Sequence, residues 1–112
     1  MPDVQSEWMC LTVLVPETLE ERVVDWLLAH PDWPVEFSIH PVAARGPLVH
    51  LAQVEERVQG HARRVELKMI VPQARLDALV AAVTGLLDGA DGGYWVLPVA
   101  RFASFRGSEV PA

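Results

Sequence analysis

The sequence predicts an α+β fold, a ferredoxin-like βαββαβ sandwich in which a four-stranded antiparallel sheet carries two helices on one face. Three observations lead to this prediction. The chain has 112 residues, which suits a single domain covering residues 1–112. Hydrophobic residues make up 51% of it, which is enough for a core. A strand–helix–strand pattern also occurs twice in succession, and two such units in tandem are typical of ferredoxin-like proteins.

The repeated pattern begins and ends with matching segments. Residues 11–16 and 67–72 are apolar stretches that each end in Val-Pro. Residues 37–42 and 94–99 each end in Pro-Val. Between the members of each pair lies a stretch in which apolar residues recur at helical spacing. The order strand, helix, strand therefore occurs twice.

Each predicted helix has an apolar stripe and a signal for its end. Pro31 disfavours helical geometry at the preceding residue, so the first helix is expected to end at His30. Gly85 and Gly89 mark where the second helix weakens and stops. The apolar stripes consist of Leu19, Val23, Trp26 and Leu27 in the first helix and Leu76, Leu79, Val80 and Val83 in the second.

Alternation along the third predicted strand assigns the two faces of the sheet. Apolar residues at every second position of residues 65–71 alternate with Glu66, Lys68 and Ile70, so the apolar set is expected under the helices. The repeat places the corresponding residues of the other strands on the same face. The residues expected there are Met9, Leu11, Val13, Val15, Val35, Phe37, Ile39, Val65, Leu67, Met69, Val71, Tyr94 and Val96.

The opposite face of the sheet, here called the open face, is also rich in apolar residues. It carries Trp8 and Trp95 together with several aliphatic residues. An apolar patch of this kind usually marks an interface. We therefore expect the chain to oligomerise through the open face. The alternative is that the C-terminal tail, from Ser104 onward, folds over it, and the end of this tail is expected to be loose.

Composition and motifs argue against several classes of function. The net charge of −6 argues against nucleic acid as a partner, because phosphate binding needs a basic surface. Cys10 is the only cysteine, so neither an intrachain disulfide nor a cysteine-rich metal cluster is expected. No apolar run reaches the roughly 20 residues that span a bilayer, and no secretory signal is recognisable, so the cytoplasm is the expected location. Catalytic-triad and phosphate-loop motifs are also absent, and no enzymatic activity is expected.

A long connection, at about residues 43–62, joins the second and third predicted strands. Connections of this length inside a small domain are often functional or disordered. Residues 51–58 have the spacing for two helical turns but few apolar positions. We expect a mobile segment that becomes ordered on contact with a partner.

Polar residues around this connection suggest two further hypotheses. His40, His50 and His61 would come together if the connection closed, and neutral imidazoles bind copper or zinc. The histidines lack a tight spacing, however, so solvated residues without a metal are the alternative. Arg63 and Arg64 are adjacent basic residues at a strand start, and they are expected to point to opposite faces, so that only one can enter any cleft.

Residues 65–99 resemble the PII-like signalling proteins. Residues 71–80, with the sequence VPQARLDALV, are similar to their third strand and the start of their second helix. Residues 89–99, with the sequence GADGGYWVLPV, resemble their glycine-rich turn and fourth strand. More narrowly, the chain resembles an uncharacterised proteobacterial PII-like family that is associated with heavy-metal efflux systems.

The resemblance implies a homotrimer with its sheets packed around the centre, ligand clefts between subunits, and a long connection that touches a partner such as a membrane transporter. It also implies a phosphate cradle in the glycine-rich turn, aided by basic residues after the fourth strand. Gly93 stands where the family carries a lysine, which argues against an adenine nucleotide as the ligand. A tight turn into the strand is the alternative role for Gly92 and Gly93. The ligand-binding residues implied by the resemblance are Gly89, Asp91, Gly92, Gly93, Arg101 and Arg106.

The expected function is therefore that of a regulatory or sensor protein that binds a small ligand between subunits and signals through the long connection. The alternative is a protein linked to metal tolerance, which takes copper, zinc or a similar divalent ion at His40, His50 and His61. The sequence does not identify the ligand or the partner.

Overall fold

The structure, a computed structural model, describes residues 7–31, 33, 36–51 and 53–107. Strands and helices alternate in the order that the repeat predicted, with one extra short helix between the second and third strands. The elements are β1 (Trp8–Pro16), the 3₁₀ turn η1 (Glu17–Leu19), α1 (Glu20–Ala29), β2 (Glu36–Ala44), α2 (Val54–Gln59), β3 (Ala62–Pro72), α3 (Gln73–Leu86) and β4 (Gly93–Val99).

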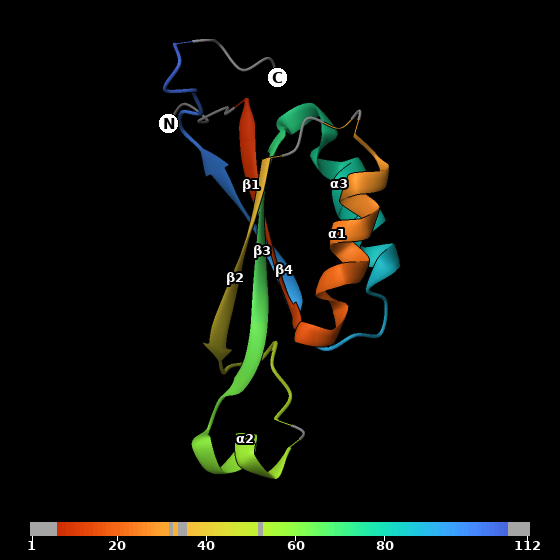
Figure 1. The fold of residues 1–112 in the computed structure, drawn as a ribbon, viewed down its shortest axis with the longest axis vertical. Helices are drawn as coiled ribbons and strands as arrows, with labels where there is room; N and C mark the ends of the chain where they lie inside the picture. The colour runs from red at the N-terminus through yellow and green to blue at the C-terminus, as the bar shows by residue number, and fades with distance from the viewer. Residues whose placement is uncertain (1–6, 32, 34–35, 52, 108–112) are drawn as a thin grey trace, which may run out of the picture.

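The described strands form one antiparallel sheet in the order β2-β3-β1-β4. Helices α1 and α3 lie side by side on one face of this sheet, and α2 lies beyond the end where β2 and β3 are joined (Figure 1). This is the predicted ferredoxin-like α+β arrangement, and the prediction of the fold class is confirmed. Strands β1 and β3 are central, while β2 and β4 form the edges.

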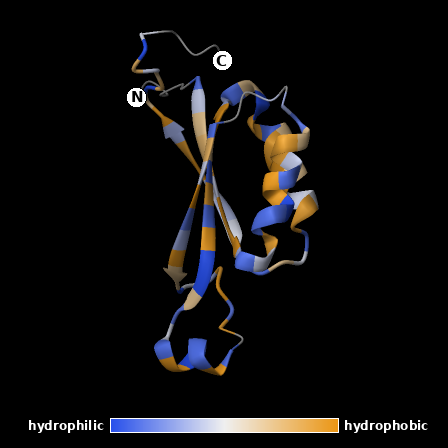
Figure 2. Cartoon of the chain, in the orientation of Figure 1, coloured by the Kyte–Doolittle hydropathy of each residue, from blue (hydrophilic) through white to orange (hydrophobic). Residues whose placement is uncertain are grey.

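Strand register explains where the core lies. Leu11 pairs with Met69 and Val13 pairs with Leu67, and all four side chains are buried under the helices. Hydrophilic and hydrophobic residues alternate along β3 (Figure 2), as expected for a strand with one buried face. Helices α1 and α3 complete the core with Val23, Leu27, Leu79 and Val83.

Tyr94 and Val35 were both expected to be buried under the helices. Tyr94 pairs with Val13 and so faces the helix side, but it is 47% exposed. It lies at the start of an edge strand, where a second neighbouring strand is lacking to cover it. Val35 lies outside the described residues.

The open face is partly covered by the chain itself. Trp8 is buried, and the ring of Phe102, which follows β4, packs on it with ring centroids 4.7 Å apart. Thr12 and Leu14 are also buried. Leu97, by contrast, is 57% exposed. The segment after β4 thus covers one end of the open face through Phe102, which precedes the tail that begins at Ser104. Covering by that tail and assembly through the remainder of the face both stay predictions.

Residues 45–61 form the connection between β2 and β3, which is slightly shorter than expected because both strands extend toward it. The two helical turns expected at residues 51–58 appear as α2, at Val54–Gln59. A capping box between Gln53 and Glu56 begins this helix, and Gly60 ends it in the left-handed conformation with φ 78°. The first long helix ends before His30, as Pro31 predicted. None of the described helices is long and apolar enough to cross a membrane.

Candidate functional site

A buried arginine, Arg64, organises the polar contacts at the end of the sheet near α2. It is only 7% exposed, whereas the preceding residue, Arg63, is exposed. Adjacent strand residues point to opposite faces of the sheet, and here the side chain of Arg64, on the open face, is the buried one. The prediction that only one of the two arginines enters a cleft agrees with this placement.

The guanidinium of Arg64 donates to groups from three parts of the chain. Its Nη2 donates to the carboxylate of Asp91 at 2.9 Å and to the carbonyl oxygen of His50 at 3.0 Å. Its Nη1 donates to the carboxylate of Glu56 at 3.3 Å and to the carbonyl oxygen of Arg63 at 2.8 Å. Its Nε is buried and finds no partner among the described residues. A buried cation thus has two carboxylates as counterions.

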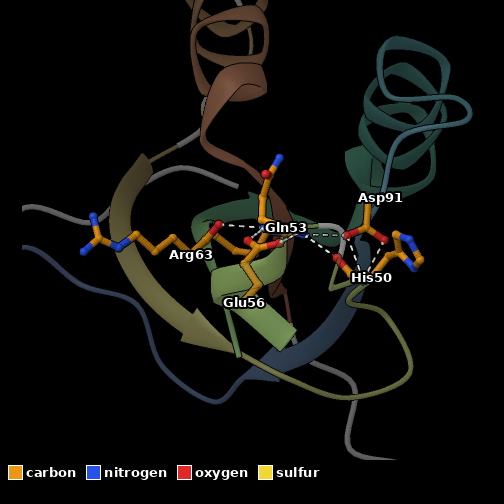
Figure 3. A network of polar contacts seen from close by, with 6 residues as sticks. His50, Gln53, Glu56, Arg63 and Asp91 are labelled. Atoms are coloured by element: carbon orange, nitrogen blue, oxygen red, sulfur yellow. Dashed lines mark hydrogen bonds and ion pairs between the residues drawn. The ribbon is translucent and has the colours of Figure 1, made fainter. Parts of the chain in front are cut away.

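Asp91 lies in the turn that precedes β4, and it also binds the connection. The backbone N–H of His50 donates to both carboxylate oxygens of Asp91, at 3.1 Å and 3.0 Å (Figure 3). Burial by itself raises the pKa of the Asp91 carboxyl. The N–H of His50 and the guanidinium of Arg64 outweigh this effect and hold that pKa below its ordinary value.

Glu56 ties α2 to the same cluster. One of its carboxylate oxygens accepts the backbone N–H of Gln53 at 3.1 Å, which caps the helix, and the other accepts Arg64 (Figure 3). We call Arg64, Asp91, Glu56 and His50 the Arg64 cluster. It joins the start of β3, the glycine-rich turn at residues 89–93, and the connection into one hydrogen-bonded unit.

The glycines of the turn have different roles. Gly92 has φ 112°, and a Cβ atom there would overlap the carbonyl oxygen of Leu14 on the neighbouring strand. Gly92 is therefore required by close backbone packing, which supports the tight-turn alternative for this residue. Gly89 also has a positive φ, of 78°, but a Cβ atom there would meet open space.

Gly93, which stands where the resembling family carries a lysine, lies against the connection. A Cβ atom at Gly93 would lie 2.9 Å from Cδ2 of Leu48, a residue of the connection. The side chain of Leu48 thus occupies the space where a lysine at this position would begin. The connection packs on the turn through an apolar contact here and through the Arg64 cluster beside it.

A pocket of about 210 Å³ lies between β1, the end of α3 and the glycine-rich turn. Its side chains are largely apolar, and the charged ones, Asp88 and Asp91, are both acidic. Its chemistry suits an apolar or a cationic group better than a phosphate. We call it the turn pocket; it is lined by Val13, Leu14, Val15, Val83, Thr84, Leu87, residues 88–93 and Tyr94.

Arg101 and Arg106 do not reach this turn within one chain. Both are exposed and follow the end of β4, whereas the turn precedes its start. Seven strand residues separate the two ends, a distance of about 20 Å. Of the residues implied by the resemblance, one chain therefore gathers Gly89, Asp91, Gly92 and Gly93, and leaves the two arginines at the opposite end of the sheet.

The histidines are also spread apart. His40 lies on β2, where its Nε2 is 3.1 Å from the hydroxyl of Ser38, and His50 contributes backbone atoms to the Arg64 cluster. His61 directly precedes β3. Within the described ranges, no group of three or more His, Cys, Asp or Glu residues is arranged to hold a metal ion. A metal site made from these histidines would need a movement of the connection or histidines from different subunits.

Sequence reasoning did not anticipate the roles of Leu48 and Glu56. Leu48 contacts Gly93, which is distant in the chain, and belongs to no motif. Glu56 caps α2 locally, but its ion pair with Arg64 depends on how the connection returns to β3. Arg64 carried a signal: strand alternation places it on the open face, between Pro16 and Val42 on the neighbouring strands, where a charged side chain needs a partner.

The fold described above is PII-like. The chain is similar in structure to PII from Arabidopsis thaliana bound to citrate, with a TM-score of 0.70 at 15% identity over 92% of this chain and 87% of that one. It is also similar to a DUF3240 family protein from Shewanella baltica, with a TM-score of 0.72 at 16% identity over 90% of this chain and 99% of that one. Sequence identities of 15–16% support a shared fold and not a shared function.

The sequence itself establishes the family. The model of the DUF3240 family, described as a protein of unknown function, matches residues 5–106, and this chain belongs to that family. No curated protein matches the sequence. The predicted resemblance to PII-like proteins is thus confirmed for the fold.

Proposed function

We propose that this protein is a PII-like regulatory protein that binds a small ligand between subunits and signals to a partner through the connection, residues 45–61. The contact of Asp91 with His50 and Arg64 carries this proposal. It joins the turn, where the resemblance implies a ligand, to the segment where the resemblance implies a partner. The role is binding and not catalysis.

The Arg64 cluster supplies the physical means of signalling. A ligand that changes the position of Asp91 removes the acceptor of the His50 N–H and one counterion of Arg64. Both changes weaken the hold on the connection. The ligand works as a signal only if it binds one state of the connection more tightly than the other.

Assembly completes the ligand site in this proposal. Leu97 and Trp95 lie on the open face of β4 and are exposed and half-buried, respectively, which supports burial against another subunit. A homotrimer built through this face brings Arg101 and Arg106 of one subunit toward the turn of the next. The partner is a membrane transporter, such as a heavy-metal efflux system, met from the cytoplasm.

The choice of ligand probes follows from the site. Leu48 beside Gly93 and the acidic side chains of the turn pocket argue against ATP. ATP is therefore the first probe, as a ligand expected not to bind. Arabidopsis PII has been solved with citrate, so citrate is the second probe. Copper and zinc test the histidine alternative, in which His40, His50 and His61 of different subunits form the site.

Native mass spectrometry of the purified protein, with and without each probe, tests the proposal. A trimer that takes up citrate but not ATP, with faster amide hydrogen exchange across residues 45–51, is the expected result. A trimer that takes up only metal, and loses it in the variant with all three histidines replaced by alanine, transfers support to the alternative. A monomer under all conditions overturns the proposal.

A further inference from the structure

Phe105 is the most exposed large apolar side chain among the described residues, at 112% of its reference area. It stands on a defined turn and not on a loose end. The N–H of Gly107 donates to the carbonyl oxygen of Ser104 at 3.2 Å, and the N–H of Arg106 donates to the hydroxyl of Ser104 at 3.1 Å. The turn therefore presents a phenyl ring to its surroundings.

The base of this turn is anchored to the sheet. Phe102, three residues earlier, packs on Trp8 at the first residue of β1. Phe105 thus follows β4, which ends at Val99, by six residues and lies three residues beyond this anchor. A large aromatic ring that is fully exposed is available to act as an anchor in the pocket of a partner.

The turn pocket has the size and polarity to receive such a ring. Its volume is about 210 Å³, and an apolar cavity of about 150 Å³ already takes a benzene ring. Val13, Val83 and Leu87 supply apolar walls. The volume and lining of this pocket therefore match Phe105.

Charge complementarity supports the same pairing. Asp88 lines the pocket and forms no ion pair within the described part of the chain. Arg106 directly follows Phe105 and Arg101 precedes it by four residues, and the side chains of both arginines are likewise without an ion pair there. An apolar ring between two cations thus matches an apolar pocket with an acidic rim.

Phe105 cannot fill the pocket of its own chain. The pocket includes Gly93 at the start of β4, whereas Phe105 follows the end of β4, about 20 Å away along the strand. The two features lie at opposite ends of the sheet, so only another copy of the chain can bring them together.

We propose that Phe105 of one subunit fills the turn pocket of the neighbouring subunit, with Arg101 and Arg106 placed near Asp88 of that neighbour. This inference rests on the homotrimer in the proposed function. Each subunit then gives one phenyl ring and receives one, a head-to-tail contact that closes into a ring. A closed trimer requires Phe105 and the turn pocket to lie at the same height along the threefold axis. Because they lie at opposite ends of β4, this strand must run across the axis.

The contact also assigns a regulatory role to Phe105. The ring covers the pocket beside the glycine-rich turn, so a ligand that enters there displaces it from the neighbouring subunit. Ligand binding and the contact between subunits are then coupled.

Crosslinking between two different chains tests the contact directly. In a Cys10→Ser background, one chain carries Thr84→Cys at the pocket and the other carries Arg106→Cys beside Phe105. The two chains carry different affinity tags and are co-expressed, and a short bismaleimide links thiols that lie close together. Ala74→Cys is the matched control, because Ala74 is exposed on the same helix about 15 Å from Thr84.

The expected result is a crosslink between the T84C and R106C chains at least tenfold more abundant than between the A74C and R106C chains. Adding Phe105→Asp to the R106C chain should remove this excess. An excess that survives Phe105→Asp in an intact trimer overturns the inference and leaves the proposed function standing. Equal crosslinking of the T84C and A74C chains overturns the inference together with the placement of Arg106 near the neighbouring turn. A monomer in native mass spectrometry overturns both.

Discussion

The guanidinium of Arg64 and the carboxylate of Asp91 lie 2.9 Å apart, although 27 residues separate them in the sequence. His50 completes the contact, because its N–H binds the same carboxylate and its carbonyl oxygen accepts the same guanidinium. This ion pair thus helps to hold the connection on the turn, together with the Arg64–Glu56 pair and the contact of Leu48 with Gly93. The following predictions test these contacts and the other features of the site.

Replacing Arg64 with methionine should destabilise the protein by about 1.5–3 kcal/mol, because charge-assisted hydrogen bonds to two carboxylates are lost. Arg63→Met is the control, since Arg63 is exposed on the same strand, and a change within about 0.5 kcal/mol is expected for it. Urea denaturation measures both. Equal effects for the two variants would show that the buried arginine is not what holds the connection.

Acid should weaken the contribution of Asp91 to stability. The pKa of this carboxyl is lower in the folded protein than in the unfolded chain. Its contribution is therefore fully present above the unfolded pKa of about 3.9 and is lost as the pH falls through the folded value. Wild type should exceed Asp91→Asn in stability near pH 7, and the gap should close below about pH 4. A gap that stays constant to about pH 3 in urea titrations contradicts this cause.

Alanine at Gly92 should be far more harmful than alanine at Gly89. At Gly92 the new Cβ combines a left-handed backbone with an overlap against Leu14, for which we expect a loss of about 3–5 kcal/mol. At Gly89 the backbone is also left-handed but the space is open, so about 1–2 kcal/mol is expected. Thermal unfolding of both variants provides the comparison, and similar losses would refute the packing argument.

Introducing the lysine of the resembling family should fail unless Leu48 is removed as well. Gly93→Lys alone must displace Leu48, which a Cβ atom at Gly93 already approaches within 2.9 Å. We expect the double variant G93K/L48A to bind ATP at least about tenfold more tightly than G93K alone, or about 1.4 kcal/mol. Isothermal titration calorimetry measures this difference. Equal affinities would mean that Leu48 is not the obstacle.

Assembly through the open face predicts different results for two similarly exposed leucines. Leu97, 57% exposed on the open face, should tolerate aspartate poorly, and Leu97→Asp should shift the protein to monomers. Leu28, 66% exposed on α1, should tolerate the same change with no effect on assembly. Sedimentation velocity distinguishes the two cases. Loss of assembly in the L28D variant instead would place the interface on the helices.

Much of the fold could be predicted from local pattern. Strand alternation placed Leu67 and Met69 under the helices, and Pro31 placed the end of α1, because both signals act within a few residues. The same rule separated Arg63 from Arg64. The glycine-rich turn was also recognisable, since glycines mark positions that other residues cannot adopt.

The site was less predictable, because its parts come from separate segments. His50, Arg64 and Asp91 each stood out in the sequence, but for other reasons, as a possible metal ligand, a basic residue and a ligand-binding residue. Only the pairing of β3 with β1, and the return of the connection over the turn, brings them within hydrogen-bonding distance.

The sequence by itself determined the fold class, the faces of the strands and the turn before β4, because periodicity and backbone constraints are local properties of the chain. The tertiary structure alone decided that Leu48 fills the space beside Gly93 and that Asp91 is occupied by Arg64. It also decided that Phe102 covers Trp8 while Phe105 stays exposed. These outcomes depend on which distant segments meet, and packing between segments leaves no periodic trace in a single sequence.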